Sequence, residues 1–254
     1  MVRILRLGTS DDQNPSVPEH DRAPAVCERT FSEAVGESAE TAIRRIVPNL
    51  DAPEVVERWL ARYEPDCVVL VISSVWCSYK TAAYRMQSTW PRPVQPLANA
   101  VQRWGGRTAS SNGLVLQAGR KVARRLVGVS ARFLPDDVVS VTEACIRTIL
   151  RHEDIVLVVR GPVTRYPGDG SDHARLRLEK LRSQVEDGLD TACKTLHVEY
   201  LARDPKAPQR DDELFLPDGV HCNAVEHGRR GTREGAALAA AWQRVNSRPR
   251  ATSR

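Results

Sequence analysis

The chain has 254 residues, of which 41% are hydrophobic and 27% charged, with 15 Gly and 16 Pro. A chain of this length can bury a sizeable core in a single α/β domain, and its composition excludes collagen-like and wholly disordered proteins. The longest apolar runs, at 67–72 and 155–159, have the length of strands and not of membrane-spanning helices. The net charge of +5 comes from basic residues spread along the whole chain beside acidic ones, so it does not indicate a nucleic-acid partner.

The first residues lack the long apolar stretch and small-residue cleavage site of a secretory signal, so we expect a cytoplasmic protein. The 6 cysteines are widely separated and form no C-x-x-C pair. This spacing predicts reduced thiols, and it favours neither a zinc ribbon nor a disulfide framework. We expect no cofactor.

Strand and helix patterns alternate along the chain. In chain order they predict a strand over 3–7, a weaker strand over 26–31, helices over 38–45 and 54–63, a strand over 66–73, helices over 112–127 and 137–151, a strand over 155–159, a helix over 171–193, a strand over 196–200 and a helix over 226–245. Ser38 is placed to cap one helix and Pro53 to open the next. The strand over 66–73 is apolar on both faces, which is typical of a central parallel strand.

The chain shows no internal repeat, so we expect a single domain over residues 1–246. The segment 77–112 carries two tryptophans, three prolines and a Gly-Gly pair, which is too long and irregular for an ordinary connection. It is predicted to be an insertion that acts as a lid or faces the substrate. Residues 247–254 form a basic tail.

Strands that alternate with helices predict an α/β fold, a doubly wound and mainly parallel sheet covered on both faces. Ligands of such sheets bind outside the carboxyl ends of the strands. The residues predicted to follow strands are therefore the candidates for function: Ser10, Gly36, Ser73–Trp76, Gly161 and the loop before the last helix.

That last loop contains Asp218 and His221, an acid and a histidine three residues apart on a turn. Asp218 can hold one imidazole nitrogen of His221 while the other nitrogen faces a reacting hydroxyl, as in a nucleophilic triad. Ser10, at the end of the first predicted strand, is the candidate nucleophile.

Gly8-Thr9-Ser10 after an N-terminal strand, Gly36, the strong third strand, and Asp218-Gly219-Val220-His221 before the final helix together resemble the SGNH (GDSL-type) hydrolases. The resemblance extends from residue 3 to about residue 245. It implies a flavodoxin-like α/β/α sandwich and an esterase or lipase-like hydrolase acting on a small acyl ester. By position, Ser10 would be the nucleophile, His221 the base, Asp218 the residue that orients it, and Gly36 one oxyanion donor.

Two blocks depart from the family pattern. Thr9 stands where the family has the aspartate of Gly-Asp-Ser, and the third block reads Ser73-Ser74-Val75-Trp76 without its asparagine. A hydroxyl of Ser73 or Ser74 could replace the missing amide donor. The same loss is also compatible with an acyltransferase or with a catalytically weak binding protein, and oligomeric state is not readable from the sequence.

Other chemistry is less favoured by the sequence. His221, Cys222 and His227 match no zinc signature, and we expect His227 to be a surface residue of the last helix. Asp11 and Asp12 could bind a cation, but a carboxylate pair in a polar loop is usually solvated, so no metal site is predicted. Cys77 has no evident base beside it in sequence.

Overall fold

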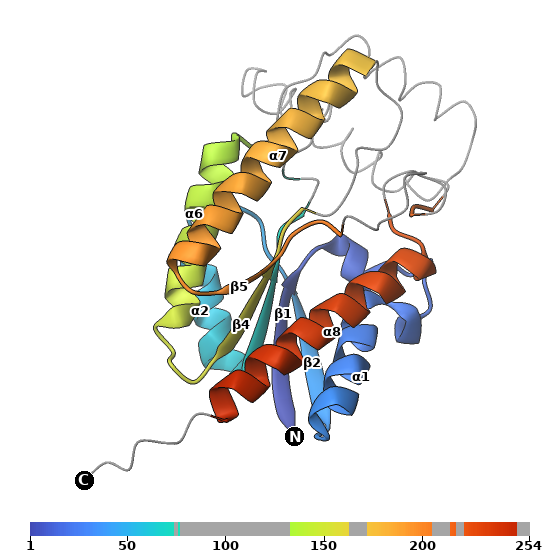
Figure 1. The fold of residues 1–254 in the computed structure, drawn as a ribbon, viewed down its shortest axis with the longest axis vertical. Coiled ribbons are helices and arrows are strands. Elements are labelled where there is room, and N and C mark those ends of the chain that lie inside the picture. The colour runs from blue at the N-terminus through green and yellow to red at the C-terminus, as the bar shows by residue number, and fades with distance from the viewer. Residues whose placement is uncertain (74–75, 77–132, 163–171, 205–213, 217–220, 248–254) are drawn as a thin grey trace, which may run out of the picture.

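The computed structural model describes residues 1–73, 76, 133–162, 172–204, 214–216 and 221–247 (Figure 1). The predicted insertion at 77–112, the predicted helix over 112–127 and most of the basic tail lie outside these residues. Two site candidates, Ser74 and Asp218, lie outside them as well.

The described strands form one five-stranded sheet in the order β2-β1-β3-β4-β5, and every neighbouring pair is parallel. The strands are β1 (Val2–Gly8), β2 (Ala39–Arg45), β3 (Cys67–Val71), β4 (Val156–Arg160) and β5 (Glu199–Leu201). This is the flavodoxin-like order, in which the connections reverse direction around β1. The predicted fold class, a three-layer α/β/α sandwich with a parallel sheet, is therefore confirmed.

Helices cover both faces of the sheet (Figure 1). One face packs against α1 (Ala23–Val35) and α8 (Ala224–Asn246), and the other packs against α2 (Ala52–Tyr63), α6 (Pro135–Leu150) and α7 (Asp172–Thr195). The fully buried residues of β3 contribute to both cores, Cys67, Val69 and Val71 on one side and Val68 and Leu70 on the other. A central strand that is apolar throughout meets this two-sided burial.

Helices α1 and α8 pack closely because α8 has glycine at the contact. A β-carbon at Gly231 would lie 2.6 Å from the carbonyl oxygen of Ala23, and one at Gly235 would lie 2.6 Å from that of Cys27. Both are backbone atoms that cannot move aside. This packing fixes the position of α8 along α1, and with it the position of the residues that precede α8.

Two predicted elements are wrong. Residues 26–31 belong to helix α1, and residues 39–45 form strand β2 instead of a helix. Gly36, with φ of 77°, is the left-handed cap that ends α1. Strand β2 is rich in Ala, Glu and Arg, which favour helices locally, but its pairing with β1 over seven positions overrides that preference.

Candidate active site

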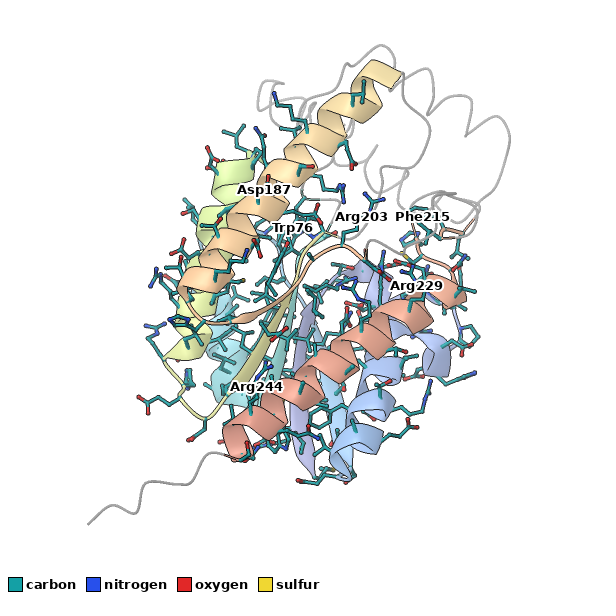
Figure 2. The ribbon with its side chains drawn as sticks, in the orientation of Figure 1. Trp76, Asp187, Arg203, Phe215, Arg229 and Arg244 are labelled. Atoms are coloured by element: carbon teal, nitrogen blue, oxygen red, sulfur yellow. The ribbon has the colours of Figure 1, made fainter. Side chains whose placement is uncertain are left out.

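The carboxyl ends of β1 and β3 place two of the predicted site residues at one edge of the sheet. Leu7 pairs with Leu70, so Ser10 and Ser73 each lie three residues beyond paired positions. Ser10 is exposed and Ser73 is half-buried. Trp76, Phe215 and Arg229 lie at this end of the molecule, whereas Arg244 lies at the opposite end (Figure 2).

Ser10 opens the short 3-10 turn η1 (Ser10–Gln13), whose conformation is set by its own acidic residue. The Thr9 N–H donates to Oδ2 of Asp12 at 2.9 Å, and the Asp11 N–H donates to Oγ1 of Thr9 at 3.2 Å. Asp12 is 3% exposed and also accepts from Arg6 at 2.9 Å. The turn Ser10–Gln13, called the serine turn below, is thus anchored to strand β1 through Arg6.

His221 begins the segment 221–223 that leads into α8, called the histidine loop below. The Leu216 N–H donates to the carbonyl of His221 at 2.8 Å, and the Asn223 N–H donates to the carbonyl of Leu214 at 3.0 Å. These backbone bonds, together with the antiparallel bridge between Phe215 and Cys222, hold residues 221–223 against residues 214–216. Asp218 lies outside the described residues. Asn223 then caps α8 by accepting from the Glu226 N–H at 2.9 Å.

One hydrogen bond joins the serine turn to the histidine loop. The backbone N–H of Cys222 donates to Oδ1 of Asp11 at 3.0 Å. Asp11 follows Ser10 and Cys222 follows His221 in the chain. Ser10 and His221 are 211 positions apart in the chain, and each is the immediate neighbour of a residue that makes this hydrogen bond.

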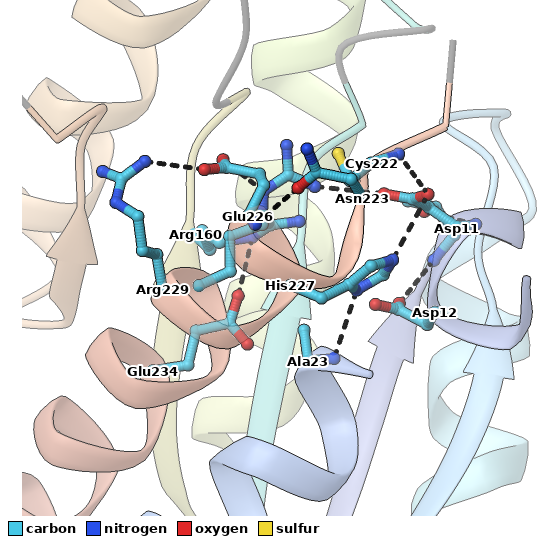
Figure 3. A network of polar contacts seen from close by, with 12 residues as sticks. Asp11, Asp12, Ala23, Arg160, Cys222, Asn223, Glu226, His227, Arg229 and Glu234 are labelled. Carbon is cyan, nitrogen blue, oxygen red and sulfur yellow. Dashed lines mark hydrogen bonds and ion pairs between the residues drawn. The ribbon is translucent and has the colours of Figure 1, made fainter. Parts of the chain in front are cut away.

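A network of buried charges supports this contact from below (Figure 3). Arg230 bonds Oδ2 of Asp11 at 3.1 Å through Nη1 and Oε1 of Glu226 at 2.8 Å through Nε. Deeper in the network, Glu234 is fully buried and bridges Arg6 at 2.5 Å and Arg160 at 2.9 Å. Each of the described carboxylates in this network, Asp11, Asp12, Glu226 and Glu234, has an arginine partner, as burial of charge requires.

His227 completes the surroundings of Asp11. Its Nδ1 accepts a hydrogen bond from the Ala23 N–H at 3.2 Å, so in the neutral ring the proton resides on Nε2, which lies 3.7 Å from Oδ1 of Asp11. Burial opposes ionisation of Asp11, but His227, Arg230 and the Cys222 side chain together hold the pKa of its carboxyl well below the usual range.

Gly36 does not belong to this site, contrary to the prediction. It follows α1 and precedes β2, so it lies at the amino end of that strand, near the N–H of Val2 that donates to the Ser38 carbonyl. Ser10 lies beyond the carboxyl end of the adjacent parallel strand. The loop that follows β2 at the correct edge is 46–51, and it contains no glycine.

The sequence prediction also missed the buried charges. Asp12 was expected to be solvated and His227 to lie on the surface, but they are 3% and 1% exposed. The available signal was Arg6 within the apolar strand β1, because an arginine in a central strand requires a buried acid. Arg160 at the end of β4 gives the same signal.

Metal and thiol chemistry find no support among the described residues. Within them, no group of three or more His, Cys, Asp or Glu side chains is arranged to hold a metal ion. Burial raises the pKa of the Cys222 thiol beside His221, so this cysteine is neither a ready nucleophile nor a ready ligand. Cys77 lies outside the described residues.

Comparison with solved structures shows the same fold in several esterases. Est24, a carbohydrate acetylesterase from Sinorhizobium meliloti, matches with a TM-score of 0.57 and 11% identity over 94% of this chain and 99% of its own. The aryl esterase of M. smegmatis matches with a TM-score of 0.52 and 15% identity over 97% and 99%. Esterase EstA from Pseudoalteromonas matches with a TM-score of 0.51 and 9% identity over 96% and 100%.

No protein-family model and no curated protein sequence matches the chain. The likeness is therefore one of fold, and it spans nearly the whole chain. The protein has the fold of the SGNH (GDSL-type) hydrolases. In the part of the chain that the structure describes, none of the helices is long and apolar enough to cross a membrane.

Proposed function

We propose that the protein is a serine-dependent hydrolase of small acyl esters, with Ser10 as nucleophile, His221 as general base and Asp218 as the residue that orients His221. The observation that carries the proposal is the 3.0 Å hydrogen bond from the Cys222 N–H to Asp11. It joins the turn of an exposed serine to the loop of a half-buried histidine, at the edge of the sheet where ligands of such folds bind.

In this mechanism His221 accepts the proton of the Ser10 hydroxyl as its Oγ attacks the acyl carbon. The tetrahedral intermediate then expels the alcohol, which takes that proton from His221, and an acyl-enzyme remains. A water molecule gives its proton to His221 and attacks the acyl-enzyme. The second tetrahedral intermediate then breaks its bond to Oγ of Ser10, which takes the proton back from His221 as the acid leaves.

The negative charge that develops on the acyl oxygen needs hydrogen-bond donors. The Ser10 N–H is among the first amides of η1, and amides at the start of a helical turn have no partner within the turn. We assign it as one donor and a hydroxyl of Ser73 or Ser74 as the candidate second. Gly36 is withdrawn from this role because it lies at the other edge of the sheet.

Acetyl esters are the first substrates to test, because the structures with this fold include a carbohydrate acetylesterase and an aryl esterase. Ser10→Ala should abolish hydrolysis of p-nitrophenyl acetate and leave the melting temperature nearly unchanged, since an exposed hydroxyl contributes little packing. Ser38 is an exposed serine directly before β2, at the amino end of the strands and away from the candidate site. Ser38→Ala is therefore the matched control and should retain activity. An active Ser10→Ala would remove Ser10 from the mechanism.

A second candidate is a binding protein of this fold with little turnover. The observation in its favour is the lack of glycine in 46–51 and of asparagine in 73–76, two positions from which oxyanion donors could come. Loss of one such donor costs serine hydrolases about 10²–10³-fold in turnover. Wild-type protein whose hydrolysis does not exceed that of Ser10→Ala would favour this candidate.

A further inference from the structure

We propose that Asp11 is a positioning residue of the reaction, which holds the histidine loop at a fixed distance from the serine turn. The inference rests on the proposed function and adds a residue to it. Asp11 does not touch the reacting atoms. It acts through the backbone of Cys222, one residue from His221.

The two ends of the Asp11–Cys222 contact are each held independently. On the serine side, the carboxylate of Asp12 binds the Thr9 N–H at 2.9 Å and fixes the turn. On the histidine side, the Leu216 N–H donates to the His221 carbonyl at 2.8 Å and holds the histidine loop against residues 214–216. Between these two local structures, the hydrogen bond from the Cys222 N–H to Asp11, at 3.0 Å, is a direct link.

The Asp11 side chain is itself prevented from turning away. Oδ2 is held by Nη1 of Arg230 at 3.1 Å, and Arg230 is held in turn by Glu226 at 2.8 Å. The Asp11 side chain is 18% exposed, and that of Arg230 is 9% exposed. A charged and largely buried hydrogen bond of this kind is stronger than one between neutral groups. One oxygen of Asp11 therefore anchors the residue to α8 while the other holds the loop.

Such a link matters because proton transfer from Ser10 to His221 depends on their separation. A misplacement of about 1 Å in a catalytic group can cost about 10²-fold in rate. Without the Asp11 carboxylate, the histidine loop remains bonded to residues 214–216 but is no longer held at a fixed distance from the serine turn. The expected effect is on turnover, because the role assigned to Asp11 is to hold the histidine loop in place and not to bind the ester.

The test compares Asp11→Ala and Asp11→Asn with Leu60→Ala. Leu60 is buried in the core on the other face of the sheet, near the end of α2, and truncating a buried leucine costs about 2–5 kcal/mol. It therefore controls for general loosening of the fold. All variants are compared at a temperature well below their unfolding transitions.

For Asp11→Ala we expect kcat for p-nitrophenyl acetate to fall about 10²-fold with KM changed less than about 2-fold. Asp11→Asn, which keeps an oxygen acceptor but loses the charge facing Arg230, should fall about 10-fold. Amide hydrogen exchange of the peptide containing 221–224 should accelerate in Asp11→Ala but not in Leu60→Ala, which should keep kcat within about 3-fold of wild type. If Asp11→Ala does not fold, Asp11→Asn carries the comparison.

Three results would overturn the inference. They are an unchanged kcat in the folded Asp11 variants, an increase confined to KM, and an equal loss of kcat in Leu60→Ala. In each of these cases wild type still hydrolyses the ester through Ser10, so the proposed function stands. A wild type no more active than Ser10→Ala would instead overturn both.

Discussion

A β-carbon added to Gly8 would lie 1.9 Å from Oδ2 of Asp12, the oxygen that accepts the Thr9 N–H. Asp12 cannot move aside, because its other oxygen is held by the buried Arg6 at 2.9 Å. The last residue of β1 must therefore be glycine for the serine turn to fold back over the strand. Gly8 is thus required by the turn.

We expect Gly8→Ala to destabilise the protein by about 1–3 kcal/mol, the usual cost of overpacking, and to lower esterase activity by displacing Ser10. Gly228→Ala is the matched control, because a β-carbon at this helical position meets nothing within 4 Å. It should be neutral or stabilising by up to about 1 kcal/mol. Urea unfolding and ester hydrolysis of both variants measure the difference, and equal stability of the two would contradict this assignment.

Glu234 makes a separate prediction about the buried charges. Glu234→Gln removes the negative charge between Arg6 and Arg160, and an uncompensated charge in the interior costs about 3–5 kcal/mol. Glu143→Gln, in the more exposed pair with Arg147 on α6, should cost less than about 1 kcal/mol. Chemical denaturation of the two variants decides the point. A Glu234→Gln variant as stable as Glu143→Gln would show that the network contributes little.

Acid stability should depend on Asp12. Burial opposes ionisation of this carboxyl, but Arg6 outweighs burial and lowers its pKa in the folded state. The folded protein therefore binds fewer protons than the unfolded chain, whose aspartates titrate near pH 3.9. The stabilisation is complete above that pH and is lost as the pH falls toward the folded pKa.

The expected result is a stability difference between wild type and Asp12→Asn that is constant from pH 7 to pH 5 and shrinks below about pH 4. Asp190→Asn, in an exposed pair on α7, provides the control and should show little difference at any pH. Urea titrations at pH 7, 5, 4 and 3 measure this dependence. A wild-type advantage that grows on acidification would mean that Asp12 is protonated in the folded protein.

Much of the fold can be predicted from local sequence, and most of the site support cannot. The strand over 66–73 and the helix over 54–63 have patterns strong enough to be placed within a few residues. Residues 26–45 were misassigned because Gly36 serves as a helix cap and β2 gains its conformation from pairing with β1. The bond between Asp11 and Cys222 spans 211 positions, and no local pattern reports such a contact.

Within the proposed triad, His221 should matter more than Asp218. His221 transfers the proton, whereas Asp218 orients and electrostatically supports the imidazole. His221→Ala should therefore lower kcat further than Asp218→Ala, with neither variant greatly changing KM. Steady-state hydrolysis of p-nitrophenyl acetate at neutral pH makes the comparison. Full activity of His221→Ala would exclude the triad.

The most direct measurement of the central claim is the reaction of the wild-type protein with a fluorophosphonate probe, followed by intact mass and peptide mapping. The account predicts one adduct per chain, located on Ser10, with labelling abolished in Ser10→Ala and strongly slowed in His221→Ala. Labelling at another residue, or no adduct on a folded wild-type protein, would contradict the claim that Ser10 is an activated nucleophile.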